Sequence, residues 1–157
     1  MSTSIPKPAA AAGTAPAQLK PPPWGAGPFA YERVVQPVLN RQCVGCHDGV
    51  RSKPDLRATL DGDKIPASYA ALIRGGWVNY HTMVYAANHN KAEPLTFGTG
   101  KSLLFTVLTD KNHATVILEP EELQALKCWV DLNCPLWPDY LHRSLRPAHA
   151  ADVTGRF

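Results

Sequence analysis

The chain has 157 residues and a mass of 17.1 kDa, which is room for one domain of ordinary size with extended ends. Its formal net charge is +3, and its Lys and Arg residues are scattered along the sequence. Because they form no basic block, we expect no nucleic acid among its partners. No stretch is long and apolar enough to predict a transmembrane segment.

The first 28 residues hold seven of the fifteen prolines and few large apolar side chains. Such a segment cannot bury enough apolar surface to offset the entropy lost on ordering. The composition predicts an extended Pro/Ala-rich arm over residues 1–28, resembling a polyproline helix at Pro21 to Pro23. Its alanine run is too short and too interrupted by proline to predict a secretory signal.

The globular part is expected over residues 29–141, and it begins with a helix that leads into Cys43. Apolar residues between Phe29 and Leu39 are spaced three to four apart, which predicts an amphipathic helix that is interrupted or restarted at Pro37. The Gly-, Pro- and Asp-rich stretch that follows Cys43 predicts turns, with one short extended piece over residues 56–60. Residues 67–74 predict a short helix, with Ser68 as a possible cap and Gly75-Gly76 as its stop.

Residues 78–100 show little periodicity and predict a long loop, of the kind that is usually functional or wrapped around something. Residues 102–110 favour a buried helix over a strand. The clearest helix follows, with Pro120 in its first turn, two glutamates at the positive end of its dipole and one apolar stripe of Leu123, Leu126, Trp129 and Val130. We expect Trp129 in the core. Residues 142–157 have no period and predict a second, C-terminal arm.

The stretch RQCVGCHDG places Cys43, Cys46 and His47 in the order Cys-x-x-Cys-His. A haem c is joined to two cysteines by thioether bonds, and a histidine directly after the second cysteine can reach the iron from the same side. The pattern predicts one covalently attached haem c per chain, with His47 as the proximal iron ligand.

Three other interpretations of the motif are weaker. A zinc site needs a second cysteine pair, and Cys128 and Cys134 are too far apart in sequence for the usual zinc knuckle. A thioredoxin-like redox pair needs a preceding strand and a parallel sheet, which the sequence does not predict. Two buried structural thiols with a surface histidine would leave the long histidine-containing loop unexplained.

The ligand on the other side of the iron is left open by residue chemistry alone. Met83 would suit an ordinary electron-transfer cytochrome, whereas His113 would give two histidine ligands and a lower potential. His81, His89 and an open position are further alternatives. Arg74, Trp77, Tyr80 and Lys101 are possible donors to the haem propionates. Cys128 and Cys134 could form a disulfide if the chain turns back at Asn133.

With the haem motif preceded by VVQPVLNRQC, the sequence resembles the cytochrome c domains of planctomycete-type bacteria, including the cytochrome modules of the hydrazine synthase alpha subunit. NHATVILEPEELQALKCWVDLNCP and LWPDY are similar to further parts of that family's pattern. The resemblance covers residues 29 to 141. It implies an all-α, small class I-like cytochrome c fold with long loops, in which the helix before Cys43 crosses the helix over residues 120–133 beside the haem, and it favours His113 over Met83 as the distal ligand.

One departure from the family pattern limits what is carried over. In the catalytic module of the family, a tyrosine four residues beyond the motif histidine ligates one haem, and this sequence has Arg51 at that position. The resemblance therefore gives no support for importing that catalytic chemistry.

These inferences predict a monohaem c-type cytochrome that transfers electrons and is not an enzyme. Its arms suggest a subunit of a larger redox assembly with redox protein partners. Covalent haem attachment favours the periplasm or another extracytoplasmic compartment, although the sequence has no visible signal peptide. The alternative is a haem protein with an open or labile sixth position that acts as a sensor or enzyme for NO, CO or peroxide.

Overall fold

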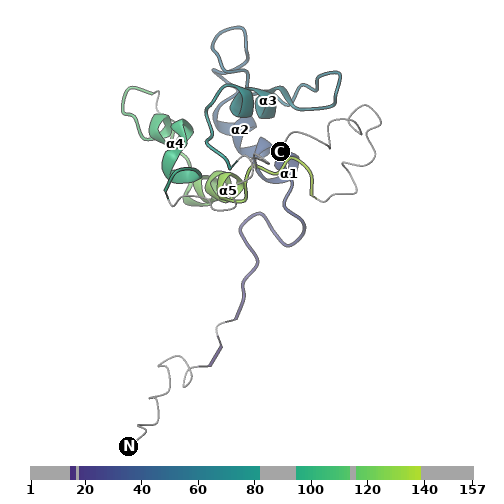
Figure 1. Cartoon of the computed structure of the whole chain (residues 1–157), viewed down its shortest axis with the longest axis vertical. Coiled ribbons are helices and arrows are strands. Elements are labelled where there is room, and N and C mark those ends of the chain that lie inside the picture. Colours follow the sequence, from purple (N-terminus) through teal and green to yellow (C-terminus); the bar gives the residue numbers. More distant parts are fainter. Residues whose placement is uncertain (1–14, 17, 82–94, 114–115, 139–157) are drawn as a thin grey trace, which may run out of the picture.

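The structure is a computed structural model that describes residues 15–16, 18–81, 95–113 and 116–138. Over these ranges the chain forms five α-helices, a 3-10 helix and no strand (Figure 1). The only β-bridge in these ranges is an isolated antiparallel bridge between Leu60 and Pro66. The predicted all-α class is therefore confirmed for the described part of the chain.

The helix before the cysteine motif is broken in two, as the sequence predicted. α1 (Tyr31–Val34) and α2 (Gln36–Gln42) are separated at Val35, and Pro37 lies in the first turn of α2. Proline is tolerated there because a first-turn N–H has no partner within the helix. α2 ends at Gln42, and the C-cap Cys43 still donates its N–H to the carbonyl of Leu39 over 2.8 Å. The motif therefore follows the helix without a loop between them.

α3 (Ala67–Arg74) matches the predicted short helix, but its start differs in one respect. The N-cap position is occupied by Pro66 and has no side-chain cap. Ser68, predicted as a possible cap, lies inside the helix, is fully buried and donates its hydroxyl proton to Oε1 of Gln36. The buried amide oxygen of Gln36 needs a donor, which explains why the serine faces inward. The helix ends at Gly75, as expected.

The second half of the domain contains η2 (Thr99–Lys101), α4 (Leu103–Leu108) and α5 (Pro120–Asp131). α5 begins with a reciprocal cap, in which the side chains of Glu119 and Glu122 each accept a hydrogen bond from the other's backbone N–H. After α5 the chain turns back through Asn133 and Cys134, which both have positive φ angles of 66° and 56°.

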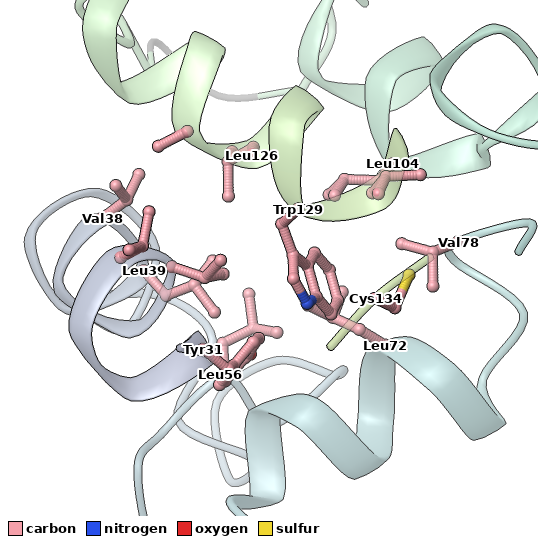
Figure 2. Close-up of a cluster of buried hydrophobic side chains, with 14 residues drawn as sticks. Tyr31, Val38, Leu39, Leu56, Leu72, Val78, Leu104, Leu126, Trp129 and Cys134 are labelled. Carbon is pink, nitrogen blue, oxygen red and sulfur yellow. The ribbon is translucent and has the colours of Figure 1, made fainter. Parts of the chain in front are cut away.

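The hydrophobic core lies where α1, α2, α3 and α5 meet, with Leu104 of α4 at its edge (Figure 2). Trp129 is 0% exposed, and its ring packs against Tyr31 and Tyr69 with centroids 5.1 and 6.0 Å away. Its indole N–H donates to the carbonyl of Pro135. Trp129 is thus the core residue predicted. Of the predicted stripe, Leu126 and Val130 are also buried and Leu123 is half-buried.

The described part of the N-terminal arm leads away from the helices (Figure 1), and its side chains are mostly exposed. Its last residues contact α1. The Arg33 guanidinium donates to the carbonyls of Trp24, Gly27 and Pro28 at 2.8 to 3.2 Å, and the Trp24 ring meets Phe29 edge-on at 5.8 Å. Contacts with the domain therefore begin at Trp24.

The remainder of the N-terminal arm and the predicted C-terminal arm over residues 142–157 lie outside the described residues. Within the ranges that the structure describes, no helix has the length and apolar character needed to cross a membrane.

Candidate functional site

The Cys-x-x-Cys-His motif forms a tight turn on the end of α2. The N–H groups of Cys46 and His47 both donate to the carbonyl of Cys43, over 3.1 and 2.9 Å. These two hydrogen bonds close a single turn of backbone over residues 43–47. The two cysteines and the histidine are therefore held together by local backbone bonds that need no other part of the protein.

The two motif cysteines have different surroundings. Cys46 is exposed, whereas Cys43 is half-buried against the hydrophobic core. Burial, with smaller contributions from the negative charge of Glu122 and from Cys46, raises the pKa of the Cys43 thiol from 9.0 to about 11. At neutral pH Cys43 is consequently a protonated thiol with an apolar side toward the core.

The loop after the motif is tied back to His47. Asp48 accepts hydrogen bonds from the N–H groups of Val50 and Arg51 and pairs with the Arg51 guanidinium at 2.7 Å. That side-chain hydrogen bond holds the pKa of Asp48 well below its usual range. The N–H of Leu56 then donates to the carbonyl of His47 over 3.0 Å. Arg51 thus stabilises the turn beside the histidine and faces Asp48.

This loop contains a position that only glycine suits. Gly49 has φ of 77°, and a Cβ atom built on it would lie 2.8 Å from the carboxyl carbon of Asp55. The Asp55 carboxylate in turn makes a two-armed contact with the Arg57 guanidinium. The close approach of Gly49 and Asp55 lets the loop return to His47 within few residues.

A buried amide holds α2 against the return loop and α3. Gln36 is 4% exposed, its Nε2 donates to the Leu56 carbonyl over 3.1 Å and to Asn40 Oδ1 over 2.9 Å, and its Oε1 accepts from Ser68. Both ends of the side chain are therefore satisfied, as buried polar groups require. Through Leu56, this network fixes the same loop segment that bonds to His47.

The histidine of the motif lies next to His113, which is 66 positions away in the sequence. Their ring centroids are 6.0 Å apart and their planes are inclined by 31°. Nδ1 of His47 is buried, and no hydrogen-bond partner is found for it within the described part of the chain. A buried ring nitrogen without a partner is costly, so this environment favours a further group beside the histidine.

The two rings are close enough for both histidines to contact one bound group. Their centroid separation of 6.0 Å places His113 directly beside the motif, and an imidazole nitrogen is a common metal ligand. If a haem c is attached to this motif, Cys43 and Cys46 would hold it covalently and His47 and His113 are the residues that would ligate its iron.

His113 is held by the segment between α4 and α5. α4 ends at Thr109, and the N–H of His113 donates to the carbonyl of Asp110 over 3.1 Å. Asp110 also accepts from the N–H of Asn112 through its side chain. This turn lies seven residues before α5 begins at Pro120, so the place of His113 depends on how α4 and α5 pack on the rest of the molecule.

The other candidate ligands are distributed differently. Met83 and His89 lie outside the described residues, as do His142 and His149. His81 packs its ring against Phe97 with centroids 5.3 Å apart, and its backbone exchanges two hydrogen bonds with the Asn133 side chain. Of the described histidines, His113 is therefore the one whose ring packs against that of His47.

The proposed propionate donors are spread over two environments. Arg74, at the end of α3, and Lys101, at the end of η2, are exposed. Trp77 and Tyr80 are partly buried and pack against the core cluster. The structure gives no contact of these four residues with His47 or with the motif cysteines, so their role stays a prediction.

Cys128 and Cys134 are free thiols in the structure. Cys128 is half-buried on α5, whereas Cys134 is 3% exposed and turns into the core (Figure 2). The positive φ of Cys134 and its N–H bond to the Trp129 carbonyl fix that inward turn. The possible disulfide between Cys128 and Cys134 stays a prediction.

Sequence reasoning missed the role of Glu122, which it took only as a favourable charge near the start of a helix. The residue is 8% exposed, and its carboxylate accepts hydrogen bonds from Arg41, from Gln42 and from the N–H of Glu119. Burial alone would raise the pKa of Glu122, but these hydrogen bonds outweigh it and the pKa lies below its usual value. The spacing of Glu119 and Glu122 is a capping-box signal, but the partners from α2 leave no mark in the sequence.

No group of three or more His, Cys, Asp or Glu side chains that could hold a metal ion gathers in the described ranges of the chain. Comparison of the chain with protein-family models, with curated proteins and with solved structures found no match.

Proposed function

We propose that the protein is a monohaem c-type cytochrome that transfers electrons. The observation that supports this most directly is the pairing of His47 and His113, with ring centroids 6.0 Å apart, directly beside two cysteines at the spacing that haem c attachment needs. Sequence motif and tertiary arrangement are independent of each other here, because His113 is no part of the motif.

In this proposal each residue has a distinct role. Cys43 and Cys46 form the two thioether bonds, with Cys43 facing the core and Cys46 facing solvent. His47 and His113 are the two iron ligands, and Met83 is the alternative to His113. The haem supplies a one-electron carrier, and the protein sets its potential through the ligands, burial and nearby charge.

The same proposal covers the cytochrome c fold, the location and the partners. The buried side chains of α2 and α5 belong to one cluster, which supports the packing expected of the helix before Cys43 against the helix over residues 120–133. We propose an extracytoplasmic location, where haem is attached covalently. The exposed part of the N-terminal arm supports a role as a subunit that contacts redox protein partners.

The test is to produce the full chain in a host that attaches haem c and to record its mass and spectra. We expect a mass increase of one haem that survives denaturation, and six-coordinate low-spin spectra in both oxidation states that carbon monoxide does not change. Failure to retain haem after denaturation would refute covalent attachment. A high-spin ferrous form that binds carbon monoxide at once would instead favour a small-ligand sensor or enzyme.

A further inference from the structure

Glu122 is a buried carboxylate that joins the end of α2 to the start of α5. Arg41 donates from Nε to its Oε1 over 3.0 Å, and the Nη2 of Arg41 forms an ion pair with the same oxygen at 2.9 Å. Gln42 donates to its Oε2 over 3.0 Å. The N–H of Glu119 completes the set at 3.1 Å. All these donors favour the ionised form, so the group is a fixed negative charge in the protein interior at neutral pH.

This charge lies next to the haem-attachment motif. Gln42, one of its partners, directly precedes Cys43 in the chain. The side chain of Gln42 donates to the carboxylate of Glu122 over 3.0 Å, so a direct hydrogen bond ties this charge to the residue beside the first attachment cysteine. A charge held this close to Cys43 acts on the ring that the sulfur of Cys43 would hold.

The countercharge of Arg41 does not cancel this field completely. The Arg41 side chain is 59% exposed, whereas that of Glu122 is 9% exposed. Solvent and salt screen the exposed guanidinium much more strongly than the buried carboxylate. A net negative potential therefore remains on the interior side of the pair.

We propose that Glu122 is a positioning and charge-setting residue that lowers the reduction potential of the haem held by Cys43, Cys46 and His47. The inference rests on the proposed function. The ferric haem carries one more positive charge than the ferrous haem, so a buried carboxylate stabilises the ferric form more strongly. The hydrogen bonds from Arg41 and Gln42 fix the distance between this charge and the motif.

The test is redox titration of the haem-loaded full chain and of two variants. Glu122→Gln keeps the shape of the side chain and removes the charge, and we expect the ferrous form to be favoured threefold to tenfold more, which is a rise in potential of up to about 59 mV for one electron. Glu121→Gln is the matched control, because it removes the same charge at an exposed neighbouring position. Its potential should stay close to that of the unaltered protein.

The outcomes separate this inference from the proposed function. If the unaltered chain holds no haem, the proposed function fails. If it holds haem and Glu122→Gln has the same potential as Glu121→Gln, only the present inference fails. It also fails if the potential of Glu122→Gln shifts together with its low-spin electron paramagnetic resonance spectrum, because the cause would then be a change at the iron ligands.

A further variant decides the matter if Glu122→Gln does not fold or does not retain haem. Arg41→Gln removes the partner charge and leaves the buried carboxylate in place. We expect its potential to fall below that of the unaltered protein, with an unchanged visible spectrum. An unchanged or higher potential in Arg41→Gln would overturn the proposal.

Discussion

The two histidines that meet in the structure are held in very different ways. His47 belongs to a turn that is bonded through its N–H to Cys43 and through its carbonyl to Leu56, and α2 leads directly into it. His113 has a backbone bond to Asp110, and its position depends on two helices that flank it. One of the two proposed ligands is thus positioned by neighbouring residues and the other by the packing of the whole domain, so we expect their removal to have different effects.

The largest effect is expected from removing the two motif cysteines, which neighbouring residues hold in place beside His47. Replacing both Cys43 and Cys46 by alanine leaves no thiol for attachment, so the denatured protein should lose the added mass of haem completely. The measurement is intact mass after production in a host that attaches haem c. Cys128→Ala, which removes a half-buried thiol outside the motif, is the control and should retain the full added mass. Haem that stays bound to the double variant through denaturation would contradict the assignment.

The next largest effect is expected from replacing His113, which should alter the spectrum while the haem stays attached. His113→Ala removes the ring that lies 6.0 Å from His47, so a low-spin, six-coordinate haem should become five-coordinate or water-ligated. Visible and electron paramagnetic resonance spectra measure this change. His81→Ala is the matched control, because the His81 ring packs on Phe97 instead.

An unchanged low-spin spectrum in His113→Ala would transfer the distal role to Met83. We expect Met83→Leu to leave the spectrum as it is, including any weak near-infrared band from a sulfur–iron bond. The two variants together therefore decide between the ligands that residue chemistry alone left open.

The contrast between the histidines also explains what the sequence could predict. The break near Pro37 and the helix starting at Pro120 depend on residues a few positions apart, and these predictions agree with the structure. Periodicity likewise identified Trp129 as a core residue. Sequence patterns among near neighbours predict those features of the structure that depend on contacts between near neighbours.

The features that sequence reasoning missed depend on distant contacts. Ser68 lies where a helix cap is possible, but its hydroxyl bonds to Gln36, 32 positions away. Glu122 lies where a negative charge favours the helix dipole, but it is also bonded to Arg41 and Gln42, about 80 positions away. Residue chemistry left His113 and Met83 as alternatives for the distal ligand, and only the family resemblance favoured His113.

A third prediction tests how much the buried hydrogen bonds of Gln36 stabilise the loop that bonds to His47. Gln36→Ala leaves Ser68 and the Leu56 carbonyl without their partner, so we expect the free energy of unfolding to fall by about 2 to 3 kcal/mol. Denaturant titration followed by circular dichroism measures it. Asn40 is an exposed residue of the same helix, and its side chain accepts a hydrogen bond from Gln36. Asn40→Ala should lower the free energy of unfolding by less than about 1 kcal/mol. Equal losses in the two variants would show that the buried hydrogen bonds of Gln36 stabilise the fold no more than the exposed one.

The smallest effect separates the two cysteines within the motif itself, in chain produced without haem and shown by circular dichroism to be helical. The thiolate is the reactive form, and the pKa of Cys43 is raised to about 11. Iodoacetamide at pH 8 should therefore label exposed Cys46 well before Cys43, and labelling of Cys43 should increase as the pH approaches 11. Peptide mass spectrometry reads both rates in one sample, with buried Cys134, whose pKa is raised to about 12, as the slow reference.

The raised pKa of Cys43 also fixes the sign of a pH effect on stability. The thiol is protonated in both states below pH 9, so the folded chain has its full stability there. As the pH rises from 9 toward 11, the unfolded chain loses this proton first, and the free energy of unfolding should decrease. Equal labelling rates for Cys43 and Cys46, with no loss of stability over this range, would show that Cys43 is not buried against the core. The two proposed attachment cysteines would then have equivalent surroundings in the folded chain.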